Sequence, residues 1–236
     1  MDPLLTSAAS GMKSRMDSLD MLANNIANTN TAGFKSDREF YNLYEQELPV
    51  VERQWTDYSQ GSMTATGNSL NLALSGKGMF ALNSPTGIVF TRNGDFRISK
   101  TNELETADGF TIRNVLDKGR PIQVDPQQAI DIAKDGVVRQ GGQDLGQIEI
   151  DTPESDPKAI AKLGSSYFAM VDPKTPVAAA QATEILQGQL ESSNVPISDS
   201  AVRLVSIMRQ FEMLQRAMNV GSEMNKQSLT DVAKVV

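Results

Sequence analysis

The chain contains neither cysteine nor histidine among its 236 residues. The missing cysteine excludes disulfides and thiolate chemistry, and the missing histidine removes the commonest general base and the commonest zinc ligand. The formal net charge of −7, without any Lys- and Arg-rich block, argues against binding to nucleic acid or to anionic membranes. These absences lower the expectation of catalysis, and the sequence suggests no cofactor and no metal.

Long apolar runs are also missing. No stretch approaches the roughly 18 apolar residues that a membrane-spanning helix needs, so we expect no direct membrane span. The opening stretch, MDPLLTSAASGMKSRMDSL, lacks a basic start followed by an apolar segment, so it predicts no cleaved secretory signal. Export by a machine that leaves the N-terminus intact stays open.

Residues 2–30 have the pattern of a helix. Asp2 before Pro3 supplies an N-cap acceptor and a preset φ at the first helical position. We expect the helix to end by Gly33, which tolerates a left-handed stop, with Phe34 folding back onto the helix as the cap's apolar contact. An apolar stripe with a seven-residue spacing runs along it: Leu5, Met12, Leu19 and Ile26, with Leu22 beside them.

The middle of the chain has β character. Between residues 61 and 180, turn pairs such as Asn93-Gly94 and Asp135-Gly136 separate short apolar segments. This pattern predicts an all-β sandwich or barrel, with TRNGD at 91–95 as a hairpin turn. Residues 36–60 are charged and aromatic and predict a connector, with partial helix as an open alternative.

The helical period returns from Ser198 to the end of the chain. One stripe is formed by Leu204, Ile207, Phe211, Leu214 and Met218. A second set widens it: Val205, Met208, Met213, Ala217, Val220 and Met224. A helix this apolar needs partners on more than one side.

These patterns predict an α+β fold in which N- and C-terminal helices pair as a coiled-coil-like layer around a central all-β domain. The expected parts are an N-terminal axial helix (1–35), a connector (36–60), the β domain (61–180), and a turn segment with a C-terminal axial helix (181–236) that packs with 1–35. The apolar surface left over then requires other copies of the chain.

Three stretches together resemble the flagellar basal-body rod proteins, within the wider rod and hook family of axial proteins. SGMKSRMDSLDMLANNIANTNTAGFKS resembles the family's N-terminal motif. LNLALSGKGMFAL with FTRNGDFRISKTNELETADGFTI resembles its central motif, and LQGQLESSNVPISDSAVRLVSIMRQFEML its C-terminal motif. The matches occur in order and, with the residues that join them, cover most of the chain.

The resemblance implies a non-enzymatic structural subunit that is exported through the flagellar type III apparatus without a cleaved signal peptide. Such a subunit polymerises into the periplasmic rod of the basal body, with its own copies and other rod proteins as partners. The terminal helices would surround an axial channel. Chain length and the segment PIQVDPQQAIDIAKDGVV favour the proximal rod, with a distal rod or hook-type axial protein as the alternative.

The candidate interface residues are the two apolar stripes and a group of helix-end amides. Asn24, Asn25 and Asn28 offer more donors and acceptors than one helix stop needs, so we expect some to bond neighbouring subunits. The simpler alternative is an elaborate helix stop. The residues of the motif turns are Asn30, Thr31, Gly33, Phe34, Ser193 and Asn194.

Other readings are weaker. SGKG at 75–78 fails the phosphate-loop pattern and predicts a tight turn between strands, and the acidic residues between 125 and 144 lack calcium-loop spacing. Arg92 and Asp95 are alternative intersubunit contacts. From other classes, a secreted dimeric adhesin or effector remains the main rival, ahead of a carboxylate-based hydrolase for which no paired acid/base motif emerges.

Overall fold

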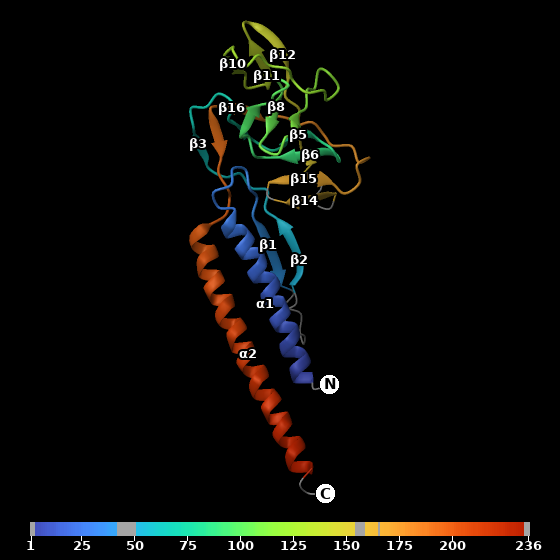
Figure 1. Cartoon of the computed structure of the whole chain (residues 1–236), viewed down its shortest axis with the longest axis vertical. Helices are drawn as coiled ribbons and strands as arrows, with labels where there is room; N and C mark the ends of the chain where they lie inside the picture. Colours follow the sequence, from blue (N-terminus) through green and yellow to red (C-terminus); the bar gives the residue numbers. More distant parts are fainter. Residues whose placement is uncertain (1–2, 42–50, 154–158, 165, 234–236) are drawn as a thin grey trace. The chain divides into compact units, whose positions relative to one another are not determined.

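The computed structural model describes residues 3–41, 51–153, 159–164 and 166–233. They form two compact units (Figure 1). The helical unit holds α1 (Pro3–Ala27), β1 (Asp37–Tyr41), β2 (Val51–Thr56) and α2 (Ile197–Ala233). The β unit holds residues 28–35 and 58–194. The chain therefore passes between the units after residues 27, 35, 57 and 194.

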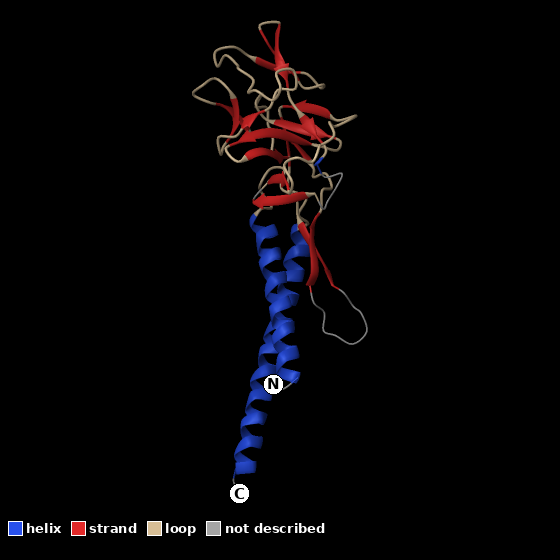
Figure 2. Cartoon of the chain, turned by 90° about the vertical axis from the view of Figure 1, so that its right-hand side faces the viewer, coloured by secondary structure: helices blue, strands red, loops and turns tan. Residues whose placement is uncertain are grey.

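The two helices of the helical unit lie side by side and run in opposite directions (Figure 2). Near one end of the pair, the Cβ position of Gly11 lies 3.5 Å from Leu214. Further along, Met21 and Leu22 of α1 pack against Ile207 of α2. In the expected connector, β1 pairs with β2 as an antiparallel ladder from Asp37 opposite Thr56 onward.

The predicted coiled-coil-like layer around the β domain is wrong, although the α+β composition holds. Among the described side chains, the buried apolar cluster of the helix pair consists of Met21, Leu22 and Ile207, with partly buried Leu19 and Leu204 against it. The other buried positions of α1 are polar or small, because α1 also contacts β1 and β2. A cluster this short is not the continuous seam of a coiled coil, and the helices form a unit with strands of their own.

The largest sheet of the β unit follows the order β14-β15-β6-β5-β9-β8-β7, with β13 paired to β5. Successive side chains of β5 point to opposite faces of the sheet. Phe80 and Leu82 enter the larger apolar core, whereas Met79 and Ala81 enter a smaller one. The strands are β5 (Met79–Ser84), β6 (Gly87–Thr91), β7 (Phe96–Ile98), β8 (Leu104–Thr106), β9 (Thr111–Ile112), β13 (Ile150–Asp151), β14 (Ile160–Gly164) and β15 (Tyr167–Met170).

Smaller sheets complete the β unit. β10 (Ile130–Ile132), β11 (Val137–Gln140) and β12 (Gln143–Gln147) form an antiparallel meander. β4 (Leu72–Ser75) pairs with β16 (Glu184–Gln187), and β3 (Met63–Ala65) pairs with β17 (Gln189–Glu191). The larger core collects side chains from several of these sheets, including Leu74, Val138 and Ile185. The strands β4, β11 and β16, which lie outside the largest sheet, therefore share one apolar core with it.

The predicted hairpin at TRNGD is also wrong. β6 and β7, which flank it, are not neighbours in the sheet. The carbonyl of Gly94 instead accepts a hydrogen bond from the backbone N–H of Leu72 at 2.9 Å. A Cβ on Gly94 would overlap the Leu72 carbonyl, so glycine is needed here for a close backbone approach rather than for a hairpin turn.

Candidate functional site

The apolar residues predicted on the two helices are mostly withdrawn from solvent within one chain. Leu22 and Ile207 are buried, and Leu19 and Leu204 pack against them. Leu5 lies in α1, but its side chain is outside the described residues. The remaining members of the stripes are half-buried: Met12, Ile26, Phe211, Leu214 and Met218.

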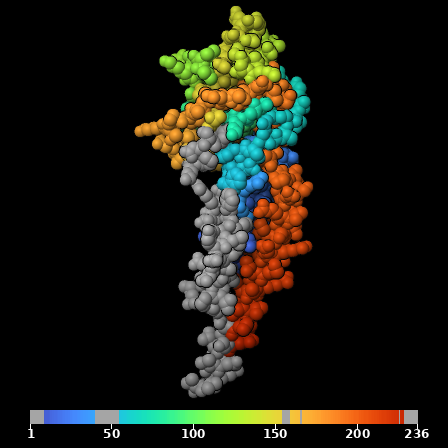
Figure 3. Space-filling view, turned by 180° about the vertical axis from the view of Figure 1, so that it is seen from behind, coloured from blue at the N-terminus to red at the C-terminus, as the bar shows by residue number. Residues whose placement is uncertain are grey.

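A different set of α2 residues forms an exposed apolar face. Val202, Met213 and Met224 are 72%, 61% and 65% exposed, and Val205, Met208 and Val220 are also exposed. Three of these, Val202, Val205 and Met213, line a shallow groove of about 590 Å³ together with Arg209. Figure 3 shows α2 side chains at the surface on the rear face of the helical unit. The apolar side chains accessible to a partner therefore lie mostly on the side of α2 that faces away from the predicted stripe.

The buried polar residues of α1 hold β1 in place. Asn25 is 4% exposed, and its amide makes two hydrogen bonds with the backbone of Asp37, donating to the carbonyl at 2.8 Å and accepting from the N–H at 3.0 Å. Ser18 donates to the Glu39 carboxylate at 2.7 Å. The Asn25 side chain is thus engaged within the chain, whereas Asn24 lies on the exposed side of the helix.

The turn that follows α1 is closed by its own polar side chains. The Thr31 hydroxyl donates to Asn28 Oδ1 at 3.1 Å, and the Thr31 N–H donates to the Asn28 carbonyl at 3.2 Å. Asn30 is exposed. The polar side chains of Asn28 and Thr31 therefore bond each other within one chain, and these bonds need no neighbouring subunit.

Gly33 and Phe34 belong to the β unit rather than to a helix cap. Gly33 has a φ of 66°, and its N–H donates to the Glu191 carbonyl at 2.7 Å. Phe34 is fully buried, with the Lys162 ammonium 4.0 Å from the ring centroid. The same ammonium donates to the Lys35 carbonyl at 2.9 Å. The expectation that Phe34 folds back onto the helix is therefore corrected: its ring packs in the β unit, under a cation.

A buried ion triad lies directly beyond Phe34. The Glu191 carboxylate bonds Lys35 Nζ through Oε1 at 2.6 Å and Arg92 Nη1 through Oε2 at 3.0 Å. All three side chains are at most 4% exposed. Further bonds support the triad: Lys35 donates to the Ser59 carbonyl, the Gly61 N–H donates to Glu191, and Arg92 donates to the carbonyls of Leu74 and Gly76.

The triad joins one residue from each of the three sequence motifs. Lys35 is the second-last residue of the N-terminal motif, Arg92 lies in the central one and Glu191 lies in the C-terminal one. Because buried charges are costly unless paired and hydrogen-bonded, this arrangement specifies which segments meet. Sequence reasoning missed Lys35 and Glu191, since a single charged residue within a motif carries no periodic signal.

Asn194, predicted as a motif-turn residue, reinforces the same region. Its amide donates to the carbonyl of Ser59 at 3.0 Å and contacts the Ser59 hydroxyl at 3.2 Å. The Asn194 N–H donates to the Phe34 carbonyl at 3.3 Å. Its neighbour Ser193 is half-buried. The two motif turns, near residues 33 and 193, thus lie against each other within the β unit.

The described residues gather no set of three or more carboxylates that could hold a metal ion. Among the residues that the structure describes, no helix is both long enough and apolar enough to cross a membrane. The ends of the chain instead form a helix pair with an exposed apolar face, and the three motifs meet in a buried ion triad. An exposed apolar face of this kind is typical of a protein that associates with a partner.

Comparison with known proteins identifies the kind of structure. Residues 5–35 match the family "Flagella basal body rod protein", residues 73–140 match "Flagellar hook protein FlgE/F/G D1 domain", and residues 186–231 match "Flagellar basal body rod FlgEFG protein C-terminal". The chain is 30% identical to the flagellar basal-body rod protein FlgF of Caulobacter vibrioides, with 92% of each chain covered. It is 32% identical to FlgF of Mesorhizobium japonicum over 82% of this chain and 83% of the relative.

FlgG of Bacillus subtilis, also a flagellar basal-body rod protein, is 31% identical over 93% of this chain and 95% of its own. The chain belongs to the family of flagellar basal-body rod proteins. It is a structural subunit of the bacterial flagellar rod, as the three motifs predicted.

Proposed function

We propose that this chain assembles with copies of itself and with other rod proteins through the exposed apolar face of α2. The observation that carries the proposal is the row of exposed valine and methionine side chains, headed by Val202 and Met224. Burying a large apolar side chain fully is worth about 1.5–3 kcal/mol. Since these side chains are already partly covered, each offers about 1 kcal/mol, and six together offer several. Methionine suits contacts that repeat in slightly different packings.

The interface is proposed to extend beyond this face. The half-buried stripe residues, from Met12 to Met218, would contribute the parts that α1 and α2 leave uncovered, and Asn24 and Asn28 are candidates for polar contacts between subunits. The role is mechanical and not enzymatic. Side-by-side burial of many helices resists twist, so a tube built in this way can transmit torque.

We infer a place in the proximal part of the rod, within the periplasm, reached through the flagellar type III export apparatus without cleavage of a signal peptide. The FlgF relatives support the proximal assignment. A distal position is the second candidate, because the FlgG relative is equally similar. Electron cryomicroscopy of basal bodies that carry a tagged copy of this subunit distinguishes the two positions.

The assembly proposal is tested by a Val205→Ser, Met213→Ser double variant, with Gln215→Ser on the same helix as the control. All three positions are exposed, so we expect thermal unfolding of the single chain to change little. Sedimentation and electron microscopy should show loss of open-ended polymers for the double variant and normal polymers for the control. Normal polymers from the double variant would contradict the proposal, and a discrete dimer from the wild type would favour the adhesin alternative.

A further inference from the structure

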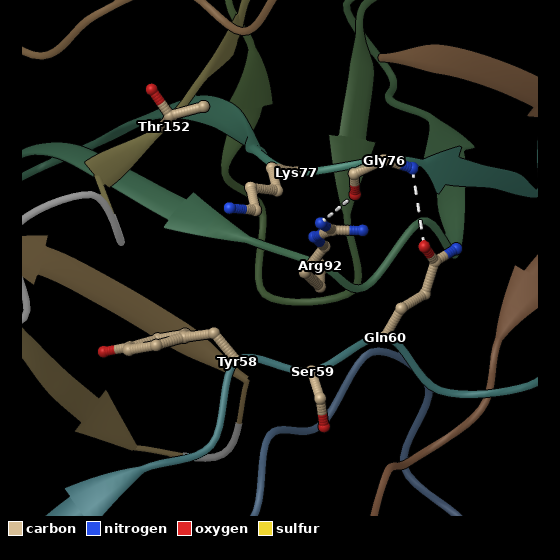
Figure 4. Close-up of a pocket in the computed structure, with 7 residues that line it drawn as sticks. All are labelled: Tyr58, Ser59, Gln60, Gly76, Lys77, Arg92 and Thr152. Atoms are coloured by element: carbon tan, nitrogen blue, oxygen red, sulfur yellow. Dashed lines mark hydrogen bonds between the residues drawn. The ribbon is translucent and has the colours of Figure 1, made fainter. Parts of the chain in front are cut away.

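A pocket of about 480 Å³ in the β unit carries two cationic side chains, Lys77 and Arg92, and no carboxylate is among the described residues that line it. Figure 4 shows both side chains reaching into the space between the backbone of residues 76–77 and that of 58–60. Tyr58 forms part of the opposite wall. All of the described residues that line the pocket belong to the β unit.

Arg92 is 3% exposed, and as a lining residue it turns a guanidinium edge toward the pocket. Nη1 donates to Glu191 and to the Leu74 carbonyl, and Nη2 donates once, to the Gly76 carbonyl. Arginine carries five N–H donors. The Nε hydrogen and one Nη2 hydrogen therefore bond nothing in the described part of the chain. A buried guanidinium with spare donors beside a pocket favours an acceptor there.

The second cation sits on a preorganised turn. Lys77 lies between Gly76 and Gly78, whose φ values of 119° and 121° are positive. Gln60 fastens the turn, since its amide donates to the Leu74 carbonyl at 3.0 Å and accepts from the Gly76 N–H at 3.4 Å. The Thr183 hydroxyl donates to the Lys77 carbonyl. The Lys77 ammonium is exposed and bonds no group in the part of the chain that the structure describes.

Among the described residues that line the pocket or belong to the ion triad, cations outnumber carboxylates. Glu191 is shared between Lys35 and Arg92, so one carboxylate faces two cations, and Lys77 adds a third at the rim. The chain as a whole has a net charge of −7, which makes this local excess of positive charge a contrast with the molecule's average. A low-dielectric setting strengthens attraction for an anion.

We propose that this pocket binds a carboxylate group, held by Arg92 at its base and Lys77 at its rim. The planar guanidinium matches a carboxylate, and the Tyr58 ring offers an apolar wall for a short aliphatic stem, as in a glutamate or aspartate side chain or a small free carboxylic acid. This site goes beyond the proposed rod function. Its occupant is either an acidic side chain of a neighbouring subunit or a free carboxylate, and both have the same chemistry.

The first test uses the unpolymerised chain and succinate as the probe. Nuclear magnetic resonance should show saturable shifts of the Gly76 and Lys77 amides when succinate replaces chloride at constant ionic strength. Lys77→Gln should weaken binding at least about fivefold, about 1 kcal/mol, whereas Lys100→Gln, an exposed lysine of the β unit, should not. No saturable shift, or equal affinity in Lys77→Gln, would overturn the proposal.

The second test separates the two sources under conditions in which the wild-type chain polymerises. If a neighbouring subunit supplies the carboxylate, Lys77→Glu slows polymer growth without changing the unfolding midpoint of the single chain, and succinate slows growth of the wild type. If growth is indifferent to both, the occupant is a free carboxylate. Because the first test needs no polymer, its outcome is independent of the assembly proposal.

Discussion

Lys35 and Glu191 are 156 positions apart in the sequence, yet their side chains form an ion pair of 2.6 Å with exposures of 1% and 0%. Lys35 is the last residue of its segment in the β unit, and Glu191 lies shortly before residue 194, where the chain returns to the helical unit. The pair, with Arg92 on the second carboxylate oxygen, therefore fastens the segments that lead to α2 and to β1. This relationship makes the triad the first target for mutation.

Glu191→Gln should destabilise the chain by about 3–5 kcal/mol, because it leaves the buried Lys35 and Arg92 charges without their carboxylate. Urea denaturation followed by circular dichroism measures the change. The matched control is Glu184→Gln, which breaks an exposed pair with Lys134 and should cost at most about 1 kcal/mol. Equal effects of the two variants would show that the triad does not hold the fold together.

Gly33→Ala should be strongly destabilising, by about 3 kcal/mol or more. A Cβ at this position would overlap the backbone of Arg92 and Asn93, and the φ of 66° adds strain of about 1 kcal/mol. Gly67 is the control, since its φ of 71° is similar but its Cβ position meets no atom within 4 Å. Gly67→Ala should therefore lower the free energy of unfolding only by the backbone strain of about 1 kcal/mol. If thermal unfolding gives the same loss for both, the close approach at Gly33 is unimportant.

Asn25→Ala should weaken the attachment of β1 to α1 by about 1–3 kcal/mol, because two hydrogen bonds with Asp37 are lost in a buried setting. Hydrogen exchange of the Asp37 amide should become faster. Asn24→Ala changes an exposed side chain and should leave this exchange unaltered while testing the proposed intersubunit contact. Unchanged protection of Asp37 in Asn25→Ala would contradict the intrachain role.

Asp151 should make stability depend on pH. Burial, with repulsion from Glu149, raises the pKa of Asp151 from 3.8 to about 6, while Arg113 opposes the rise. Its protonated form therefore favours the folded state: the contribution is complete below about pH 4 and is lost as the pH rises through 6. Asp151→Asn should raise the Tm at pH 7–8, by a few degrees at most after solvent screening, and the gain should shrink toward pH 4. Asp131→Asn, an exposed carboxylate on β10, is the control. A Tm gain for Asp151→Asn that stays constant from pH 8 to pH 4 would contradict this assignment.

The spacing of apolar residues predicted most of the secondary structure. The helical patterns ending near Gly33 and beginning near Ser198 correspond to α1 and α2, and the short apolar segments between turn dipeptides correspond to strands such as β5 and β6. Helix and strand periods depend on residues within a few positions of one another, so a sequence displays them directly. The family was identified separately, by the resemblance of three ordered motifs to those of the rod proteins.

The sequence by itself therefore determined the helical ends, the β-rich middle and membership of the rod protein family. Only the tertiary structure decided that Lys35, Arg92 and Glu191 meet, that Phe34 packs in the β unit, that β1 and β2 accompany the helices, and which face of α2 stays exposed. The physical reason is that these relationships depend on the path of the chain over long separations. Burial and charge pairing select partners by position in space, which no local period records.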